Sequence, residues 1–253
     1  MIHYKNIMEK IRSGLVLRLP DNPHQEKNNS LGRKICDQIK SSIPLGFKLF
    51  VIQLSEKDIE CYNTDIDSSE KERFVYYLED ENIRIAFYIH SKNHIVSIDK
   101  DSMKKARNEI IKIGEFAQEI NTGNFDIPLI CHIGGAKGDR KRSMIEFGKF
   151  YESLNWRIQK QICLVNDEKP SLFSVKDLLS YTYLEKRIPI VFRTASHRTN
   201  QGGLTYKESL FLAASTWAER ANPIMFYCPT NIEETVTIQD LNPYNLVMDI
   251  AFD

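Results

Sequence analysis

The chain has 253 residues, which suits one large or two small domains and is too long for a module held together by disulfides. Its 34 lysines and arginines balance 34 aspartates and glutamates, so no bulk charge draws the protein to nucleic acid or to an anionic membrane. Any site for a polyanion must therefore be a local patch.

The five cysteines are odd in number and widely spaced, with no C-x-x-C pair, which argues against a disulfide framework and against a structural zinc site. No stretch reaches the roughly 18 apolar residues of a membrane span, and the charged N-terminus lacks the apolar core of a signal peptide. We therefore expect a soluble, intracellular protein of the cytoplasm or of the nucleus or nucleoid, with no membrane partner.

Eight short apolar runs follow one another along the chain and predict eight strands. Nearly every gap between them holds a segment of helical periodicity. Strands that are apolar on successive residues and separated by helices indicate a parallel sheet covered by helices. The fold expected is α/β, a single (β/α)8 TIM barrel over residues 1–253, with a doubly wound open sheet as the alternative. The runs begin near Leu15, Phe47, Ile83, Ile127, Ile158, Ile188, Ile224 and Leu246.

Capping residues predict where the helices begin, because a side-chain oxygen at the N-cap accepts a hydrogen bond from a free backbone N–H of the first turn. An acid three residues later can in turn accept from the backbone N–H of the N-cap residue. The predicted caps are Ser69 with Glu72, Ser174 with Asp177, Thr205 with Glu208, Asp101 or Ser102, and Asp139.

The last apolar run ends with the printed sequence, so we expect no eighth outer helix. The N-terminal segment 1–12 is predicted to form an amphipathic helix that covers the exposed flank of the barrel, using Ile2, Ile7, Met8 and Ile11. A partner subunit is the alternative cover.

Polar residues that follow each apolar run are the candidates for chemistry, because the carboxyl ends of the strands build the active site of such a barrel. They are His90, Ser91, Lys92 and His94 after the third run, His132 and the loop GGAKGDRKR after the fourth, Asn166, Asp167 and Glu168 after the fifth, Arg193, Ser196, His197 and Arg198 after the sixth, and Cys228 after the seventh.

Two kinds of site fit these residues. Imidazoles and carboxylates at one rim can hold zinc or manganese for hydrolysis, and they can equally be hydrogen-bonded core residues. The metal interpretation uses His90, His132, Asp167 and His197, of which the last three would be catalytic. The glycine loop that opens a basic helix favours a phosphate or DNA site, with a tight turn beside a solvated basic face as its alternative. That anion site would use Gly134, Gly135, Lys137, Arg140, Arg193 and Arg198.

Four stretches of the sequence carry motifs in a recognisable order. They are IPLICHIGGAKGD, CLVNDEKPSLFSVKDLL, IPIVFRTASHR and NQGGLTYKESLFLAASTW. In these stretches the chain resembles the UV-damage endonucleases, a family of metal-dependent DNA-repair nucleases with a TIM-barrel fold. The resemblance runs from about residue 12 to the end of the sequence.

The resemblance implies a centre of divalent ions held by histidines and carboxylates at the strand ends. Of the family's ligand positions His132 is kept, with Asn166 and Asp167 nearby. An arginine in place of a carboxylate replaces attraction for a cation by repulsion, at about 4 kcal/mol per unit charge pair at about 4 Å in an effective dielectric near 20. The remaining positions fall on Tyr88, Val165, Arg193, Ser196, Phe226 and Ile250, with Asp249 next to the last.

We therefore hypothesise that the chain keeps the barrel, binds no metal and has lost the metal-dependent nuclease activity. It would serve as a nucleic-acid-binding or protein-interaction component, with DNA or another protein subunit as its partner. Two alternatives stay open: an active DNA endonuclease with a rebuilt manganese or zinc site, and a phosphate-binding barrel that acts on a small phosphorylated ligand.

Overall fold

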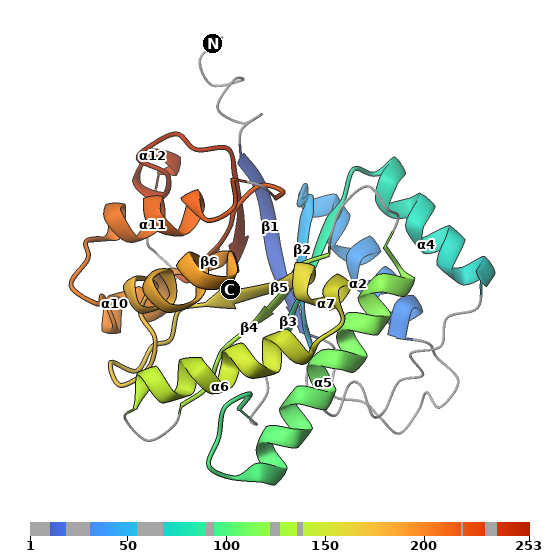
Figure 1. The fold of residues 1–253 in the computed structure, drawn as a ribbon. Coiled ribbons are helices and arrows are strands. Elements are labelled where there is room, and N and C mark those ends of the chain that lie inside the picture. Colours follow the sequence, from blue (N-terminus) through green and yellow to red (C-terminus); the bar gives the residue numbers. More distant parts are fainter. Residues whose placement is uncertain are drawn as a thin grey trace.

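A computed structural model describes residues 11–18, 31–54, 68–89, 94–121, 127–135, 139–218, 220–230 and 237–253. Within these residues eight parallel strands form a closed barrel in chain order, and β8 pairs with β1 (Figure 1). This confirms the TIM barrel and rules out the open sheet. The strands are β1 (Ile11–Arg18), β2 (Leu49–Leu54), β3 (Arg84–Ile89), β4 (Leu129–Cys131), β5 (Ile162–Val165), β6 (Ile190–Arg193), β7 (Ile224–Tyr227) and β8 (Met248–Phe252).

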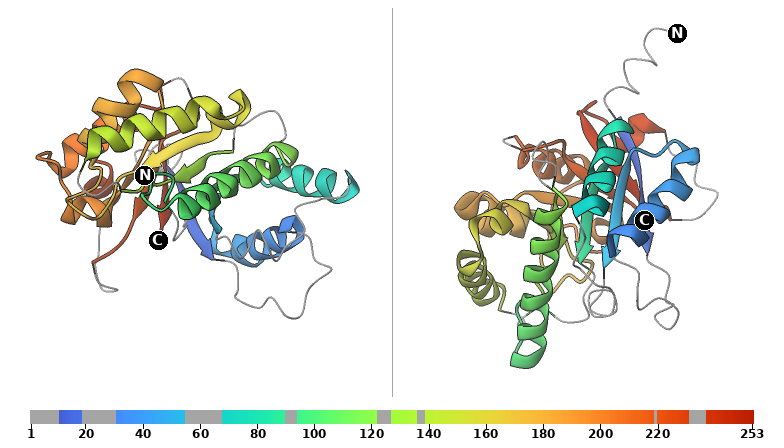
Figure 2. Two further views of the ribbon diagram at one scale, coloured as in Figure 1. Left: turned by 60° about the horizontal axis from the view of Figure 1, so that its bottom comes forward. Right: turned by 90° about the vertical axis from the view of Figure 1, so that its right-hand side faces the viewer.

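Helices lie outside the strands and follow them in alternation, as the further views in Figure 2 show. The described helices are α2 (Leu31–Ser42), η1 (Ile43–Leu45), α4 (Ser68–Asp80), α5 (Lys100–Glu119), α6 (Arg140–Ser153), α7 (Trp156–Gln161), α8 (Val175–Leu178), η2 (Leu179–Tyr183), α9 (Leu184–Lys186), α10 (Thr194–Thr199), α11 (Tyr206–Ser215) and α12 (Ile238–Leu241). None of them combines the length and hydrophobicity that a membrane crossing needs.

Three predicted helix starts are confirmed. Thr205 and Ser174 each form a capping box with the acid three residues later, and the Asp139 side chain accepts a hydrogen bond from the backbone N–H of Arg142. Each box satisfies backbone N–H groups that have no partner within the helix.

Two predicted starts are wrong by a few residues. Helix α5 is capped by Asp99, whose side chain accepts from the backbone N–H of Asp101, so Asp101 and Ser102 already lie in the first turn. Helix α4 includes Ser68, which places Ser69 inside the helix and not at its cap. In α5 the polar residue that starts the helix lies two positions upstream of the predicted cap Asp101.

Two predicted strand boundaries are also corrected. Ile158 begins no strand, because Asn155 caps α7 at this point and β5 starts only at Ile162. Ile11 and Arg12, the last residues of the predicted N-terminal helix, belong to β1 and pair with β8. Residues 1–10 lie outside the described part of the chain.

Side chains alternate along each strand between the barrel interior and the helix layer. The outward residues, such as Phe50, Phe87 and Phe192, join the helices in the larger hydrophobic core. The inward residues form a second core inside the barrel. The inward core consists of Leu49, Val51, Ala86, Tyr88, Ile130, Cys163, Val165, Val191, Trp217, Ile224, Phe226 and Ala251.

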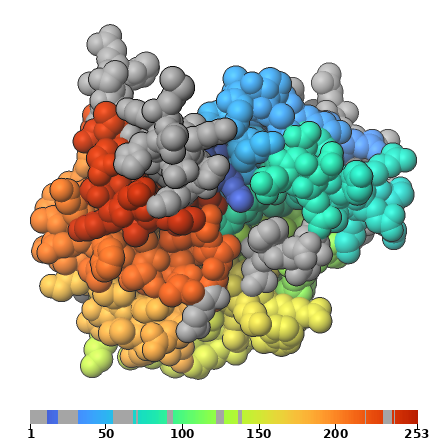
Figure 3. Space-filling view, turned by 90° about the horizontal axis from the view of Figure 1, so that it is seen from above, coloured from blue at the N-terminus to red at the C-terminus, as the bar shows by residue number. Residues whose placement is uncertain are grey.

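A buried polar cluster lies at the amino-terminal ends of the strands. Seen from above, the early part of the chain (blue to teal) lies beside its last part (orange to red) on the surface (Figure 3). The guanidinium of Arg84 forms an ion pair with Asp249, donates to the carbonyl of Asn222 at 2.7 Å and lies over the ring of Trp217. The indole N–H of Trp217 donates to the carbonyl of Ile190 at 2.8 Å. Because this end is filled, the accessible chemistry lies at the opposite, carboxyl-terminal mouth.

Candidate functional site

The strand ends place a ring of polar side chains around the mouth. Each of these residues lies two positions beyond a residue of its strand whose side chain packs inside the barrel. Because residues two apart on a strand point to the same side, their side chains also point inward, at the level of the mouth. The ring consists of Arg18, Gln53, Tyr88, His132, Asp167, Arg193, Cys228 and Asp253.

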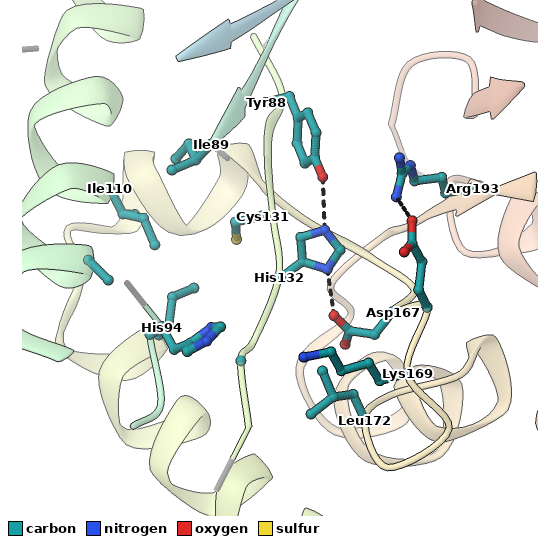
Figure 4. Close-up of a pocket in the computed structure, with 14 residues that line it drawn as sticks. Tyr88, Ile89, His94, Ile110, Cys131, His132, Asp167, Lys169, Leu172 and Arg193 are labelled. Atoms are coloured by element: carbon teal, nitrogen blue, oxygen red, sulfur yellow. Dashed lines mark hydrogen bonds and ion pairs between the residues drawn. The ribbon is translucent and has the colours of Figure 1, made fainter. Parts of the chain in front are cut away.

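A hydrogen-bonded chain links three members of this ring (Figure 4). Nδ1 of His132 lies 2.7 Å from Oδ1 of Asp167, and its Nε2 lies 2.9 Å from the hydroxyl of Tyr88. A carboxylate only accepts, so Nδ1 carries the proton and Nε2 accepts from the phenol. Burial raises the pKa of Tyr88 far above its ordinary value, so its hydroxyl remains a donor. Both nitrogens of His132 are therefore engaged.

Arg193 places a positive charge in the mouth. Its Nη1 lies 2.6 Å from Glu168, and its Nη2 and Nε lie 3.0 and 3.2 Å from the same oxygen of Asp253. Burial alone would lower the pKa of Arg193, but Tyr88, Cys228 and Asp253 raise it, so the guanidinium stays charged.

The backbone of Arg193 is fixed by the strand beside it. The side chain of buried Asn166 accepts from the backbone N–H of Arg193 at 2.8 Å and donates to its carbonyl at 3.2 Å. The side-chain amide of Asn166 thus continues the hydrogen bonding between β5 and β6 beyond the last backbone pair. These two hydrogen bonds fix the backbone from which the Arg193 side chain projects into the mouth.

A cavity of about 240 Å³ lies beside the mouth, against the end of β3 and helix α5. Its lining combines the polar ring with buried apolar side chains, a composition typical of ligand sites. The lining residues are Tyr88, Ile89, His94, Ile95, Ala106, Ile110, Cys131, His132, Gly134, Asp167, Glu168, Lys169, Leu172 and Arg193.

Of the residues predicted to hold a metal or to be catalytic, the structure brings His132 and Asp167 together and leaves His197 apart. The ring of His197 packs against Phe192 at 5.3 Å and Tyr206 at 6.3 Å, in the layer between strand and helices. Helix α10 begins directly after β6, so His197 turns away from the mouth. His90 lies outside the described residues.

Of the two predicted phosphate-binding glycines, Gly134 forms part of the cavity wall. Gly134 has φ +88°, and a Cβ there would lie 2.6 Å from the Cβ of His94. A Cβ on Gly135 would meet a methyl group of Leu172 at the same distance. Glycine is therefore required at Gly134 for backbone conformation as well as for packing, whereas a Cβ at Gly135 would press on the end of the Leu172 side chain.

The predicted phosphate-binding cations lie in different settings. Arg140 reaches from α6 to Asp177 at 3.2 Å and to the carbonyl of Pro170, and so ties this helix to the loop after β5. Arg198 is exposed and donates to the carbonyl of Cys228 at 2.8 Å. Arg193 lies in the mouth as expected, and Lys137 lies outside the described residues.

Sequence reasoning missed the contribution of β8. Ile250, which the resemblance aligned with the family's last ligand, packs in the outer core, and Asp249 lies at the amino-terminal end. Asp253 is the residue of this strand region that reaches the mouth. The alternation of Asp249, Ala251 and Asp253 was the available signal, since residues two apart share a face.

Residues 79–240, more than half of the chain, match the family model of UV-endonuclease UvdE. The chain belongs to this family. The UvdE barrel is also similar to the crystal structure of SacUVDE, with a TM-score of 0.76 at 17% identity over 96% of this chain and 92% of that one. The crystal structure of endonuclease IV from Thermus thermophilus gives a TM-score of 0.64 at 11% identity, over 95% of this chain and 91% of that one.

Two curated UV DNA damage endonucleases are similar in sequence. The one from Clostridium perfringens (strain 13 / Type A) is 25% identical over 170 residues, 66% of this chain, and the one from Bacillus mycoides (strain KBAB4) is 26% identical over 143 residues, 56% of this chain. The matched parts make up 40% and 43% of these relatives, so this UvdE chain matches less than half of their length.

The side chains at the mouth do not fit the divalent-metal centre that membership of the UvdE family implies. Nε2 of His132 already accepts from Tyr88, and Arg193 lies between Glu168 and Asp253. Among the described residues, no three His, Cys, Asp or Glu side chains group closely enough to hold a metal ion. The donors are engaged with one another and with a guanidinium.

Proposed function

We propose that this UvdE-family barrel binds DNA at its mouth and does not cut it by a metal-dependent mechanism. The observation that carries the proposal is the guanidinium of Arg193, held by Glu168 and Asp253 inside the mouth. Taken alone, this charge would repel a divalent ion about 4 Å away by roughly 8 kcal/mol, twice the value for a unit charge pair in an effective dielectric near 20, and the carboxylates of Glu168 and Asp253 that offset this repulsion are engaged with the guanidinium.

Apolar packing supports the loss of the metal site. Tyr88 and Phe226, at two positions where the resemblance places metal-ligating histidines, meet edge to face with ring centroids 5.3 Å apart. This contact stabilises the barrel interior but offers no imidazole to an ion. Val165, at the position where the resemblance places the family's strand-five glutamate, lies in the same inward core.

DNA is the proposed partner because the two curated relatives are UV DNA damage endonucleases and because cations surround the mouth. Arg18 has 74% of its side chain exposed, and Arg198 is exposed as well. Contacts from such side chains to phosphates release counterions and make affinity fall with salt. The proposed role is recognition of DNA, with cleavage left to another protein or absent.

The test combines cutting and binding. Purified protein with Mn²⁺ should leave UV-irradiated supercoiled plasmid intact, while fluorescence anisotropy should show salt-dependent binding to a short duplex. Arg198→Gln should weaken that binding, and Arg157→Gln, on α7 at the amino-terminal end of β5, serves as the matched control and should not. Metal-dependent nicking would refute the proposed loss of activity. Equal affinities of both variants and the wild type would refute binding at the mouth.

A further inference from the structure

We infer that the cavity beside the mouth is a binding site for a small anion with a compact apolar body. The inference goes beyond DNA binding, because it concerns the cavity that extends from the mouth toward helix α5 and not the exposed cations around the mouth. It depends on a gradient of polarity from the exposed entrance to the buried end.

The inner end of the cavity is apolar. Ile89, Ile95, Ile110 and Cys131 line it and are 4%, 3%, 1% and 2% exposed, and Ala106 of α5 completes this wall. The pairing of β3 with β4 ends at Tyr88 and Ile130, so the next residue of each strand lies beyond the ladder, and the cavity lies there. An apolar group placed at this end would contact buried apolar side chains instead of water.

The entrance is polar, and its charged side chains differ in whether they are already paired with another residue or can still bind a ligand. Glu168 is paired with Arg193, and Asp167 holds His132. Lys169 is exposed, lines the cavity and makes no side-chain hydrogen bond or ion pair with any other described residue, and Figure 4 shows its ammonium group directed into the cavity. The charge left for a ligand is therefore positive.

Lys169 is also held in place by its backbone. The side-chain amide of buried Asn200 donates to the carbonyls of Asp167 and Lys169, both at 3.1 Å. The segment that carries the ammonium group is thus fixed to α10, so binding need not order it first.

The volume of the cavity and the chemistry of its lining restrict the class of ligand that it can bind. A cavity of about 240 Å³ is below the usual range for drug-sized molecules and suits a single ring or a short branched chain. A nucleobase fits poorly, because its N–H and carbonyl groups would face the apolar wall without partners. The ligand class is therefore a carboxylate or a phosphate monoester with one small apolar group, oriented with its charge toward Lys169.

Benzoate and phenyl phosphate, the two probes of the test, differ only in the anionic group. Each is titrated into the full chain while the ¹³C-methyl NMR signals of isoleucine are followed, together with calorimetry. We expect saturable shifts at Ile89, Ile95 and Ile110 with at least one probe, and the stronger binder identifies the head group. Shifts that grow linearly with either probe, or that spread over isoleucines elsewhere, would overturn the site.

Three variants sharpen this test. Lys169→Gln removes the charge from an exposed position and should weaken binding about tenfold, as expected for one charge-assisted hydrogen bond. Lys176→Gln, an exposed lysine of α8 outside the cavity lining, is the matched control and should leave the affinity unchanged. Ala106→Leu should fill the inner end and abolish binding. Equal affinities for the wild type and Lys169→Gln would contradict the proposed role of Lys169.

Duplex DNA serves as the competitor. Because the cavity extends inward from the mouth toward α5, while the DNA contacts proposed above are made by Arg18 and Arg198, saturating DNA should not displace the probe. Displacement would show that the cavity belongs to a DNA site and would overturn its assignment to a small ligand. Failure of DNA to bind would leave the probe titration unaffected, so the two proposals fail separately.

Discussion

Replacing Arg193 with alanine should destabilise the whole barrel, because this side chain links β6 to the end of β8. The ion pair with Asp253 is largely buried, with side chains 20% and 8% exposed. Without the guanidinium, the partners that Asp253 keeps among the described residues are Arg18 at 3.7 Å and the thiol of Cys228 at 3.5 Å. Both contacts are too long to replace the two guanidinium N–H groups that donate to one oxygen of Asp253.

The expected loss follows from these exposures. Breaking a fully buried pair costs about 3–5 kcal/mol, and an exposed one about 0–1 kcal/mol. The contact with Asp253 lies nearer the first case, so we assign it about 2–3 kcal/mol. Glu168 is 56% exposed, so its contact with Arg193 adds at most about 1 kcal/mol. The total is about 3 kcal/mol, which corresponds to a fall in Tm of roughly 6–12 °C for a chain of this size.

Urea denaturation followed by circular dichroism measures this loss. A double-mutant cycle of Arg193→Ala with Asp253→Asn should give a coupling energy near 2 kcal/mol, while the cycle with Glu168→Gln, the matched control, should give less than about 1 kcal/mol. A coupling near zero with Asp253, or equal couplings with both acids, would refute the assignment.

Burial lowers the pKa of His197 below its ordinary 6.5. Just below pH 6.5 this imidazole is therefore protonated in the unfolded chain but remains neutral in the folded chain. The free energy of unfolding should stay constant above about pH 6.5 and fall by up to about 1.4 kcal/mol per pH unit below it. Urea denaturation between pH 5 and 7 measures this slope, and His197→Phe should reduce it. An unchanged slope would exclude His197 as the cause. Gly134→Ala should cost about 1–3 kcal/mol more than Gly203→Ala, because both positions have positive φ but only Gly203 has space for a Cβ, and equal losses would contradict the packing argument. Asp167→Asn should remove the fixed Nδ1–H tautomer of His132 in ¹⁵N NMR spectra, and an unchanged spectrum would show that another group sets the tautomer.

The order of strands was predictable because parallel strands buried on both faces are apolar on successive residues. Their ends were less so. Ile158 continues an apolar run toward β5, yet Asn155 starts a short helix there, and a helix of two turns leaves too little periodicity to be distinguished from a strand.

The candidate site was predictable where a strand simply ends in a polar residue, as at His132, Asp167 and Arg193. His197 was misplaced because the residues after β6 become helical at once, which changes the rotation per residue from half a turn to about 100°. Tyr88 was overlooked as a hydrogen-bond donor, since in sequence it is one more aromatic residue in an apolar strand.

The central claim is that a guanidinium, and not a divalent ion, provides the positive charge in the mouth. Titration of the purified chain with Mn²⁺, followed by electron paramagnetic resonance of the free ion, tests it most directly. We predict that the free-ion signal rises in proportion to added Mn²⁺, as in a buffer blank, for the wild type and for His132→Ala alike. Stoichiometric uptake by the wild type that is lost in His132→Ala would contradict the account.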